Sequence, residues 1–117
     1  PFVASSVNDC MKLEIGNTSE GSLSSPRDKC TYDFVKDHPN ITQKDACNTI
    51  QSPNYKRFCQ QTLAVRLNDS SLCDSAFLGE KIAQFCLRDS AIALKRVDWC
   101  EKITDSVQKS YCQSSAK

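Results

Sequence analysis

The sequence has little of what most enzyme active sites are built from. Its 117 residues include one histidine, His38, and three glycines. A single histidine leaves few ways to build a zinc site or to activate a nucleophile. The chain has neither a glycine-rich phosphate-binding loop nor a Gly-x-Ser-x-Gly turn. We therefore expect that the protein is not an enzyme and has no catalytic residues, no cofactor-binding residues and no metal.

His38 belongs to the one group that resembles an acid–base or metal cluster. Asp33 and Asp37 are four residues apart, so on a helix they would share a face beside the imidazole. Charged residues at a helix end before a proline, here Pro39, are usually solvated surface groups. We favour the surface interpretation.

Long apolar runs and blocks of one charge are also missing. The 15 Lys and Arg residues are mixed with 14 Asp and Glu residues, for a formal net charge of +1 and a mean hydropathy of −0.47. The paired cations at 56–57 and 95–96 are too few to follow a phosphate backbone, so we expect no nucleic-acid partner. The longest apolar stretches, 63–65 and 91–94, are too short for a membrane span. Residues 1–4 lack the basic and apolar regions of a signal peptide, as expected of a processed exported protein.

Cysteine, by contrast, is abundant and regularly spaced. The eight cysteines form a leading set and a trailing set that alternate along the chain. The leading set is Cys10, Cys47, Cys73 and Cys100, and the trailing set is Cys30, Cys59, Cys86 and Cys112. The last three pairs recur every 26 or 27 residues, and an aromatic residue precedes three trailing cysteines, at Phe58, Phe85 and Tyr111. This pattern predicts four copies of one small unit.

An even number of regularly spaced cysteines in a short chain predicts a disulfide framework and an oxidising location, extracellular or at the cell surface. Zinc sites use cysteines only a few residues apart, whereas these are at least 12 residues apart. Pairing within units joins each leading cysteine to the next trailing one. The alternative joins each trailing cysteine to the next leading one, and leaves Cys10 and Cys112 to join each other or another molecule. We favour pairing within units, because a short helix and a tight turn bring the starts of two helices together.

Helical periodicity accompanies the trailing cysteines. Residues 59–67 overlay residues 86–94, with apolar side chains spaced by one and two helical turns. Each unit is therefore expected to contain a short first helix that begins at the leading cysteine and a longer second helix through the trailing one. We place Asp45, Ser71 and Asp98 as N-caps of the short helices, and Pro53 and Gly79 in the turns.

The first unit contains an insertion. Residues 16–26 are polar and rich in turn-forming residues, which predicts a surface loop whose deletion costs little stability. Pro39 predicts the end of a helix near Asp37. The last four residues, 114–117, are expected to fray.

A hairpin of two helices this short cannot bury its apolar face alone, so neighbouring hairpins must stack. We predict an all-α fold of four short disulfide-stapled helical hairpin repeats, at about 7–42, 43–69, 70–96 and 97–117, stacked as a small α-solenoid in one domain, 1–117. A disulfide that closes a loop of about 13 residues contributes up to about 3 kcal/mol, which offsets a small core. The residues expected in the core are Ile50, Leu67, Leu94, Trp99 and Ile103.

Three Asn-x-Ser/Thr triplets begin at Asn17, Asn40 and Asn68. Each falls between expected helices, where a glycosyltransferase could reach it. One such triplet arises easily by chance, but three in the loops of a cysteine-rich chain favour a glycosylated surface protein.

The segments Asp98-Trp-Cys-Glu-Lys-Ile103 and Ser110-Tyr-Cys112 resemble the tandem cysteine-paired α-helical hairpin repeats of exported prokaryotic proteins, many of them uncharacterised. Those repeats also show Asp-x-Cys-x-x-Ile, then a spacer, then an aromatic residue and cysteine. The resemblance covers residues 43–113 well and residues 7–35 poorly, because of the insertion. It implies an extracytoplasmic α-repeat protein and carries over no active site.

We expect a secreted protein with a structural or adhesive role, a subunit of an extracellular filament or surface layer. Its partners would be other protein subunits, including copies of itself, since end-to-end contacts between stacked repeats extend subunits into a fibre. The alternative is a secreted monomeric binding module, such as an effector, inhibitor or carrier, with Trp99 or Tyr55 exposed on a concave surface.

Overall fold

The computed structural model describes residues 6–117, and this part of the chain is all-helical, with seven α-helices, one short 3-10 helix and no strand. The expected absence of a signal peptide concerns residues 1–4, which lie outside the described residues. The chain forms two compact units, Pro1–Cys59 and Gln60–Lys117, which we call unit 1 and unit 2. The all-α prediction is confirmed, while the single domain stays a prediction.

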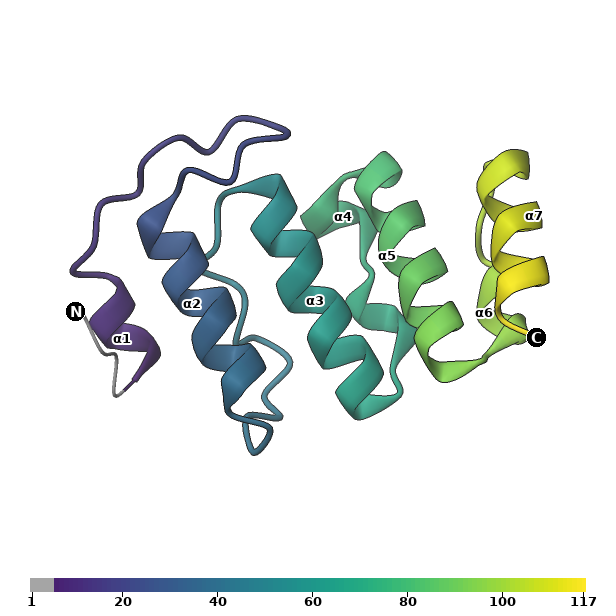
Figure 1. Ribbon diagram of the computed structural model, residues 1–117, viewed down its shortest axis with the longest axis horizontal. Coiled ribbons are helices and arrows are strands. Elements are labelled where there is room, and N and C mark those ends of the chain that lie inside the picture. Colours follow the sequence, from purple (N-terminus) through teal and green to yellow (C-terminus); the bar gives the residue numbers. More distant parts are fainter. Residues whose placement is uncertain (1–5) are drawn as a thin grey trace. The chain divides into compact units, whose positions relative to one another are not determined.

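Unit 1 contains α1 (Val7–Cys10), α2 (Pro26–Asp37) and the first half of α3 (Pro53–Leu67) (Figure 1). The Ser25 side chain caps α2 by accepting a hydrogen bond from the Asp28 backbone N–H, and Pro26 occupies the first helical position, where its missing N–H costs nothing. The helix ends at Asp37, as the proline two residues later predicts.

Unit 2 contains the second half of α3 and all later elements. These are the 3-10 helix η1 (Ser70–Leu72), α4 (Ser75–Leu78), α5 (Glu80–Leu94), α6 (Val97–Cys100) and α7 (Ser106–Ser115). The long helix α5 packs against α4, α6 and α7. Gly79 separates α4 from α5 with a φ of 84°, a conformation that favours glycine, so its predicted place in a turn is confirmed.

The short helices differ from the prediction in where they start. Helices α1 and α6 end at their leading cysteines, and Cys47 lies in a series of turns. Because the short helices do not begin at the leading cysteines, the predicted caps are also wrong. Asp45 lies in a turn, Ser71 lies inside η1, and Asp98 lies inside α6. The aspartates that do cap helices follow the cysteines or precede η1, at Asp69, Asp74 and Asp105.

Pro53 is the first residue of α3 rather than a turn residue. Proline is favoured at this position, because its fixed φ suits the helix and its missing N–H would have no partner there.

The core confirms two of the four predicted aliphatic positions and corrects the others. Ile50 and Ile103 are 1% and 2% exposed, whereas Leu67 and Leu94 are only half-buried. Both half-buried leucines are the last residues of their helices, just before residues with positive φ where the chain turns away. The equivalent inward positions one turn earlier are fully buried: Leu63, Ala64, Ser90 and Ala91. Trp99 is 3% exposed, so its predicted place in the core is confirmed.

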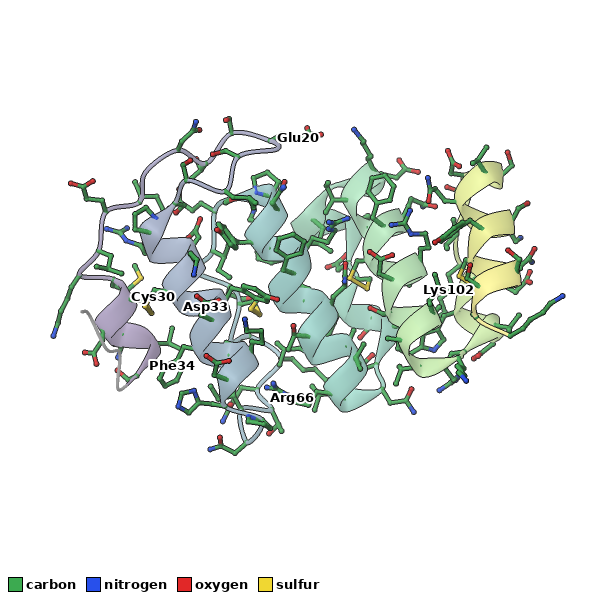
Figure 2. The ribbon with its side chains drawn as sticks, viewed as in Figure 1. Glu20, Cys30, Asp33, Phe34, Arg66 and Lys102 are labelled. Carbon is green, nitrogen blue, oxygen red and sulfur yellow. A yellow bond between two sulfur atoms is a disulfide. The ribbon has the colours of Figure 1, made fainter. Side chains whose placement is uncertain are left out.

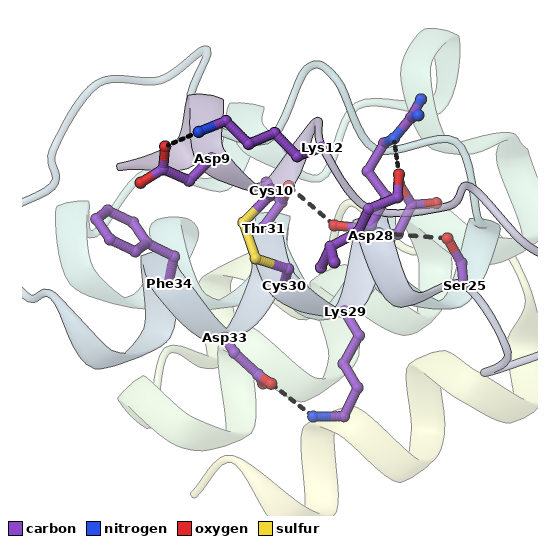
Figure 3. The surroundings of a disulfide bond; sticks show 12 residues. Asp9, Cys10, Lys12, Ser25, Asp28, Lys29, Cys30, Thr31, Asp33 and Phe34 are labelled. Atoms are coloured by element: carbon purple, nitrogen blue, oxygen red, sulfur yellow. Dashed lines mark hydrogen bonds and ion pairs between the residues drawn. A yellow bond between two sulfur atoms is a disulfide. The ribbon is translucent and has the colours of Figure 1, made fainter. Parts of the chain in front are cut away.

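All eight cysteines form disulfides, and the pairs are those of the within-unit scheme. They are Cys10–Cys30, Cys47–Cys59, Cys73–Cys86 and Cys100–Cys112. Figure 3 shows the first of them, which joins α1 to α2, with Thr31 and Phe34 of α2 nearby. The predicted fraying of residues 114–117 is wrong, because α7 continues to Ser115 and the Ala116 side chain is fully buried.

Candidate functional site

A buried carboxylate joins the first two hairpins in unit 1. Asp28 is 1% exposed, and its Oδ2 atom accepts hydrogen bonds from the backbone N–H groups of Gln51 at 3.1 Å and Ser52 at 2.7 Å. These N–H groups precede α3, where no earlier helical turn can supply an acceptor. Asp28 on α2 therefore supplies the hydrogen-bond acceptor for the backbone just before α3, which is the second helix of the next hairpin.

Unit 2 repeats this contact with a different side chain. The Gln84 Oε1 atom on α5 accepts from the backbone N–H groups of Thr104 at 2.8 Å and Asp105 at 3.3 Å, just before α7. Asp28 and Gln84 each lie two residues before a trailing cysteine, and the N–H groups they bind lie four and five residues after a leading one. Hairpin 1 thus docks on hairpin 2 in unit 1 as hairpin 3 docks on hairpin 4 in unit 2.

The aromatic residues before the trailing cysteines take part in the same docking. In unit 1 the ring of Tyr32 lies 5.7 Å from that of Phe58. In unit 2 the guanidinium of Arg88 lies between two rings, 5.0 Å from Phe85 and 5.4 Å from Tyr111. Tyr32 and Arg88 both lie two residues after a trailing cysteine. An aromatic ring therefore contacts the preceding hairpin's helix in both units, once through a second, tilted ring and once through a cation–π contact.

Unit 2 carries a groove of about 590 Å³ between the start of α5 and the start of α7. We call it the Phe85 groove. It is lined by Glu80, Lys81, Gln84, Phe85, Thr104, Asp105 and Gln108. The size falls within the range of ligand pockets, and the lining combines one aromatic ring with hydrogen-bond donors and acceptors.

Exposed apolar side chains are few, and two of them share one face of α7. Val107 is 72% exposed and Tyr111 is 55% exposed, one helical turn apart. The Tyr111 ring also lies near the guanidinium of Arg88, which is near the Phe85 ring as well. Helix α7 therefore carries this apolar face and also contributes Gln108 to the Phe85 groove.

The predicted polar insertion is a loop, but it is packed more closely than expected. Ser25 is 1% exposed, and the loop carbonyl groups of Ser22 and Leu23 accept hydrogen bonds from side chains at the start of α3. Gly16, with a φ of 68°, lies so close to the Ser24 carbonyl that a Cβ atom there would be 2.3 Å from the oxygen. The loop is thus part of the packing of unit 1.

In the suspected acid–base cluster, Asp33 and His38 have other partners in the structure. Asp33 forms ion pairs with Lys29 at 2.6 Å and Lys36 at 3.5 Å, and its hydrogen bond raises the pKa of the Lys29 amine. His38 stacks on Phe34, with 4.0 Å between ring centroids, and its Nδ1 atom lies 2.7 Å from the Phe34 carbonyl oxygen. Within residues 6–117, no group of His, Cys, Asp or Glu residues is arranged to hold a metal ion.

All three predicted glycosylation sites lie on exposed residues: Asn17, Asn40 and Asn68. The Asn17 Oδ1 atom accepts hydrogen bonds from the backbone N–H and the hydroxyl of Ser19, within its own triplet. The Asn68 Oδ1 atom accepts from Arg96, whose guanidinium also binds Asp98 and lowers the pKa of that carboxyl group. The placement is accessible, and glycosylation itself stays a prediction.

Sequence reasoning missed the two docking side chains and the groove. Asp28 and Gln84 occupy the same place in the repeat, but Arg57 and Ser110 stand there in the other two units. The available signal was a polar side chain two residues before each trailing cysteine. Because the residue type differs in every unit, the sequence alone does not show that the position has a common role. The groove depends on how two helices pack, which residue spacing does not show.

Comparison of the chain with known protein families, curated protein sequences and solved structures finds no match. The four disulfides indicate an oxidising environment. Among residues 6–117, no helix has the length and apolar composition needed to cross a membrane.

Proposed function

We propose that the protein is a secreted, disulfide-stabilised helical repeat protein with a structural or adhesive role, a subunit of an extracellular filament or surface layer. The observation that carries the proposal is the exposed apolar face of α7, formed by Val107 and Tyr111 on the helix whose Gln108 lines the Phe85 groove. Exposed apolar side chains that gather beside a groove are typical of protein interaction surfaces. The partners are other protein subunits, including copies of this chain.

The fold suits a structural role in an oxidising location outside the cell. Small exported domains rely on disulfides because their cores are small. The docking contacts made by Asp28 and Gln84 have the same register, which supports a stack in which all four hairpins form one small α-solenoid.

The experiment that tests assembly is light scattering of the purified, oxidised protein over a range of concentrations, with negative-stain microscopy of the largest species. We expect the mean mass to rise with concentration, and we expect Tyr111→Ser to shift the rise to higher concentration. Val97→Ser is the matched control, because Val97 is 37% exposed on a different helix. A monodisperse monomer at every concentration overturns the proposal.

The Phe85 groove favours a second candidate, the monomeric binding module. The surface expected for it, with Trp99 or Tyr55 exposed, is not the one found, because these residues are 3% and 5% exposed. The groove takes its place as the binding surface. A protein that stays monomeric, yet retains one host or envelope protein in a pull-down that Thr104→Trp abolishes, is this second candidate.

A further inference from the structure

The loop in unit 1 covers two side chains at the start of α3. The Ser52 hydroxyl donates a hydrogen bond to the Ser22 carbonyl at 3.4 Å, and the Tyr55 hydroxyl donates to the Leu23 carbonyl at 2.9 Å. As a result Ser52 is 0% exposed and Tyr55 is 5% exposed. The Gly21 backbone N–H adds a third contact by donating to the Asn54 side chain at 3.2 Å.

The equivalent positions in unit 2 are open. Asp105 and Gln108 stand seven and four residues before Cys112, as Ser52 and Tyr55 stand before Cys59. Asp105 is exposed, Gln108 is half-buried, and both line the Phe85 groove. The groove therefore corresponds, in the register of the repeat, to the surface that the loop covers in unit 1.

The loop also presents an unburied apolar side chain. Leu23 is 54% exposed, although its carbonyl group is held by Tyr55. Figure 2 shows Glu20 at the bend of the same loop, two residues before Ser22. Because the backbone at Leu23 is anchored on its own unit, the Leu23 side chain can enter a partner's groove without rearrangement of the loop, which keeps the entropic cost of binding low.

We propose that the Phe85 groove binds the loop of residues 16–25 from a second copy of this chain, with Leu23 against the Phe85 ring. The groove can satisfy the polar groups of such a loop. The Gln108 amide of the groove carries N–H donors for loop carbonyl groups, and the Glu80 and Asp105 side chains carry acceptors for loop hydroxyls. This inference rests on the proposed assembly and names the contact that produces it.

The two halves of this contact are different surfaces of one chain. Leu23 belongs to unit 1 and the Phe85 groove belongs to unit 2. A molecule that gives its loop to one neighbour therefore keeps its groove available for another, so the contact propagates unless it closes into a ring. A single leucine gives a small contact, so we expect it to be weak and to form only at high protein concentration, at which the assembly experiments are made.

The heterologous contact makes a mixing experiment decisive. Leu23→Ser removes the apolar side chain but keeps the groove, and Thr104→Trp fills the groove but keeps the loop. Both positions are exposed, and Thr104→Trp removes one side-chain hydrogen bond, from the Gln84 amide at 3.1 Å, while it keeps the backbone N–H that Gln84 binds. Circular dichroism of each variant checks that it folds. We expect each variant alone to be monomeric by light scattering, and an equimolar mixture to form dimers that do not grow further. Assembly of either variant alone, to the same extent as the unsubstituted protein, overturns the inference.

A synthetic peptide of residues 16–25 tests the contact without relying on assembly. Titrated to millimolar concentration into the isotope-labelled protein, it should shift the backbone amide signals of Phe85, Thr104 and Gln108. The same peptide with serine in place of Leu23 should bind about tenfold more weakly, since it loses most of the buried apolar area. Absence of shifts in the groove, or equal binding of both peptides, overturns the inference.

The two arms separate this inference from the proposed function. A protein that assembles but does not bind the peptide assembles through another surface, which overturns the inference and leaves the proposed function standing. A protein that binds the peptide in the groove but stays monomeric overturns the proposed function, while the groove's choice of this loop is upheld.

Discussion

At the scale of single residues, two polar side chains determine how neighbouring hairpins dock. Asp28 and Gln84 each accept hydrogen bonds from two backbone N–H groups at the start of a later helix. Asp28 is buried, whereas Gln84 is half-buried at the edge of the groove. The buried contact is directional and must be complete, because an unpaired N–H group away from water costs about 1–3 kcal/mol.

Replacement of Asp28 by alanine should therefore be among the most harmful polar substitutions in unit 1. It leaves the backbone N–H groups of Gln51 and Ser52 without their acceptor, and we expect a loss of about 3 kcal/mol in the free energy of unfolding. Urea denaturation followed by circular dichroism measures it. The control is Asp33→Ala, which removes only exposed ion pairs with Lys29 and Lys36 and should cost about 0.5 kcal/mol. Equal losses for the two variants would show that Asp28 has no special role in docking.

At the scale of elements, the sequence predicted the long helices well and the short ones poorly. The second helices are amphipathic over several turns, so their apolar spacing identifies Leu63 and Ala91 as inward-facing. A four-residue helix such as α1 or α6 has too few residues to show a period. Its position is set by the disulfide and by tertiary contacts, which explains why the predicted caps at Asp45 and Asp98 are wrong.

Leu63 and Leu67 provide a test of where the core of the long helices ends. Leu63 is fully buried, and Leu67, one turn later, is half-buried at the end of α3. We expect Leu63→Ala to lower the free energy of unfolding by about 2–5 kcal/mol, in the range of other core leucines. The loss for Leu67→Ala should be clearly smaller, because part of its side chain already contacts water. A larger loss at Leu67 would mean that its helix end is more deeply packed than the structure shows.

At the scale of the whole molecule, the repeat of the cysteines was the strongest signal in the sequence. It predicted the disulfide bonds, because a short repeated unit with one disulfide has few ways to pair its cysteines. The all-helical fold was predicted from the apolar spacing of the segments that follow the trailing cysteines. It could not predict that the loop of residues 16–25 packs on the start of α3 while the equivalent positions in unit 2 stay open. The loop is held by hydrogen bonds to its backbone carbonyl groups. Because every residue type has a backbone carbonyl group, the sequence gives no sign of such contacts.

The disulfides should carry most of the stability of so small a protein. Each closes a loop of about 12–20 residues and contributes about 3 kcal/mol in the chain-entropy model, whereas a domain of this size is stable by only about 5–15 kcal/mol in total. We therefore expect reduction with excess dithiothreitol to abolish most of the helical circular dichroism signal at neutral pH.

The double variant that replaces Cys100 and Cys112 by serine, which removes one disulfide, should instead stay folded with a lowered midpoint in urea. Non-reducing peptide mapping of the unsubstituted protein provides the reference, with four separate linked pairs. A fully reduced protein that keeps its helices would show that the hairpins are held by their packing, and that the cysteines serve another purpose.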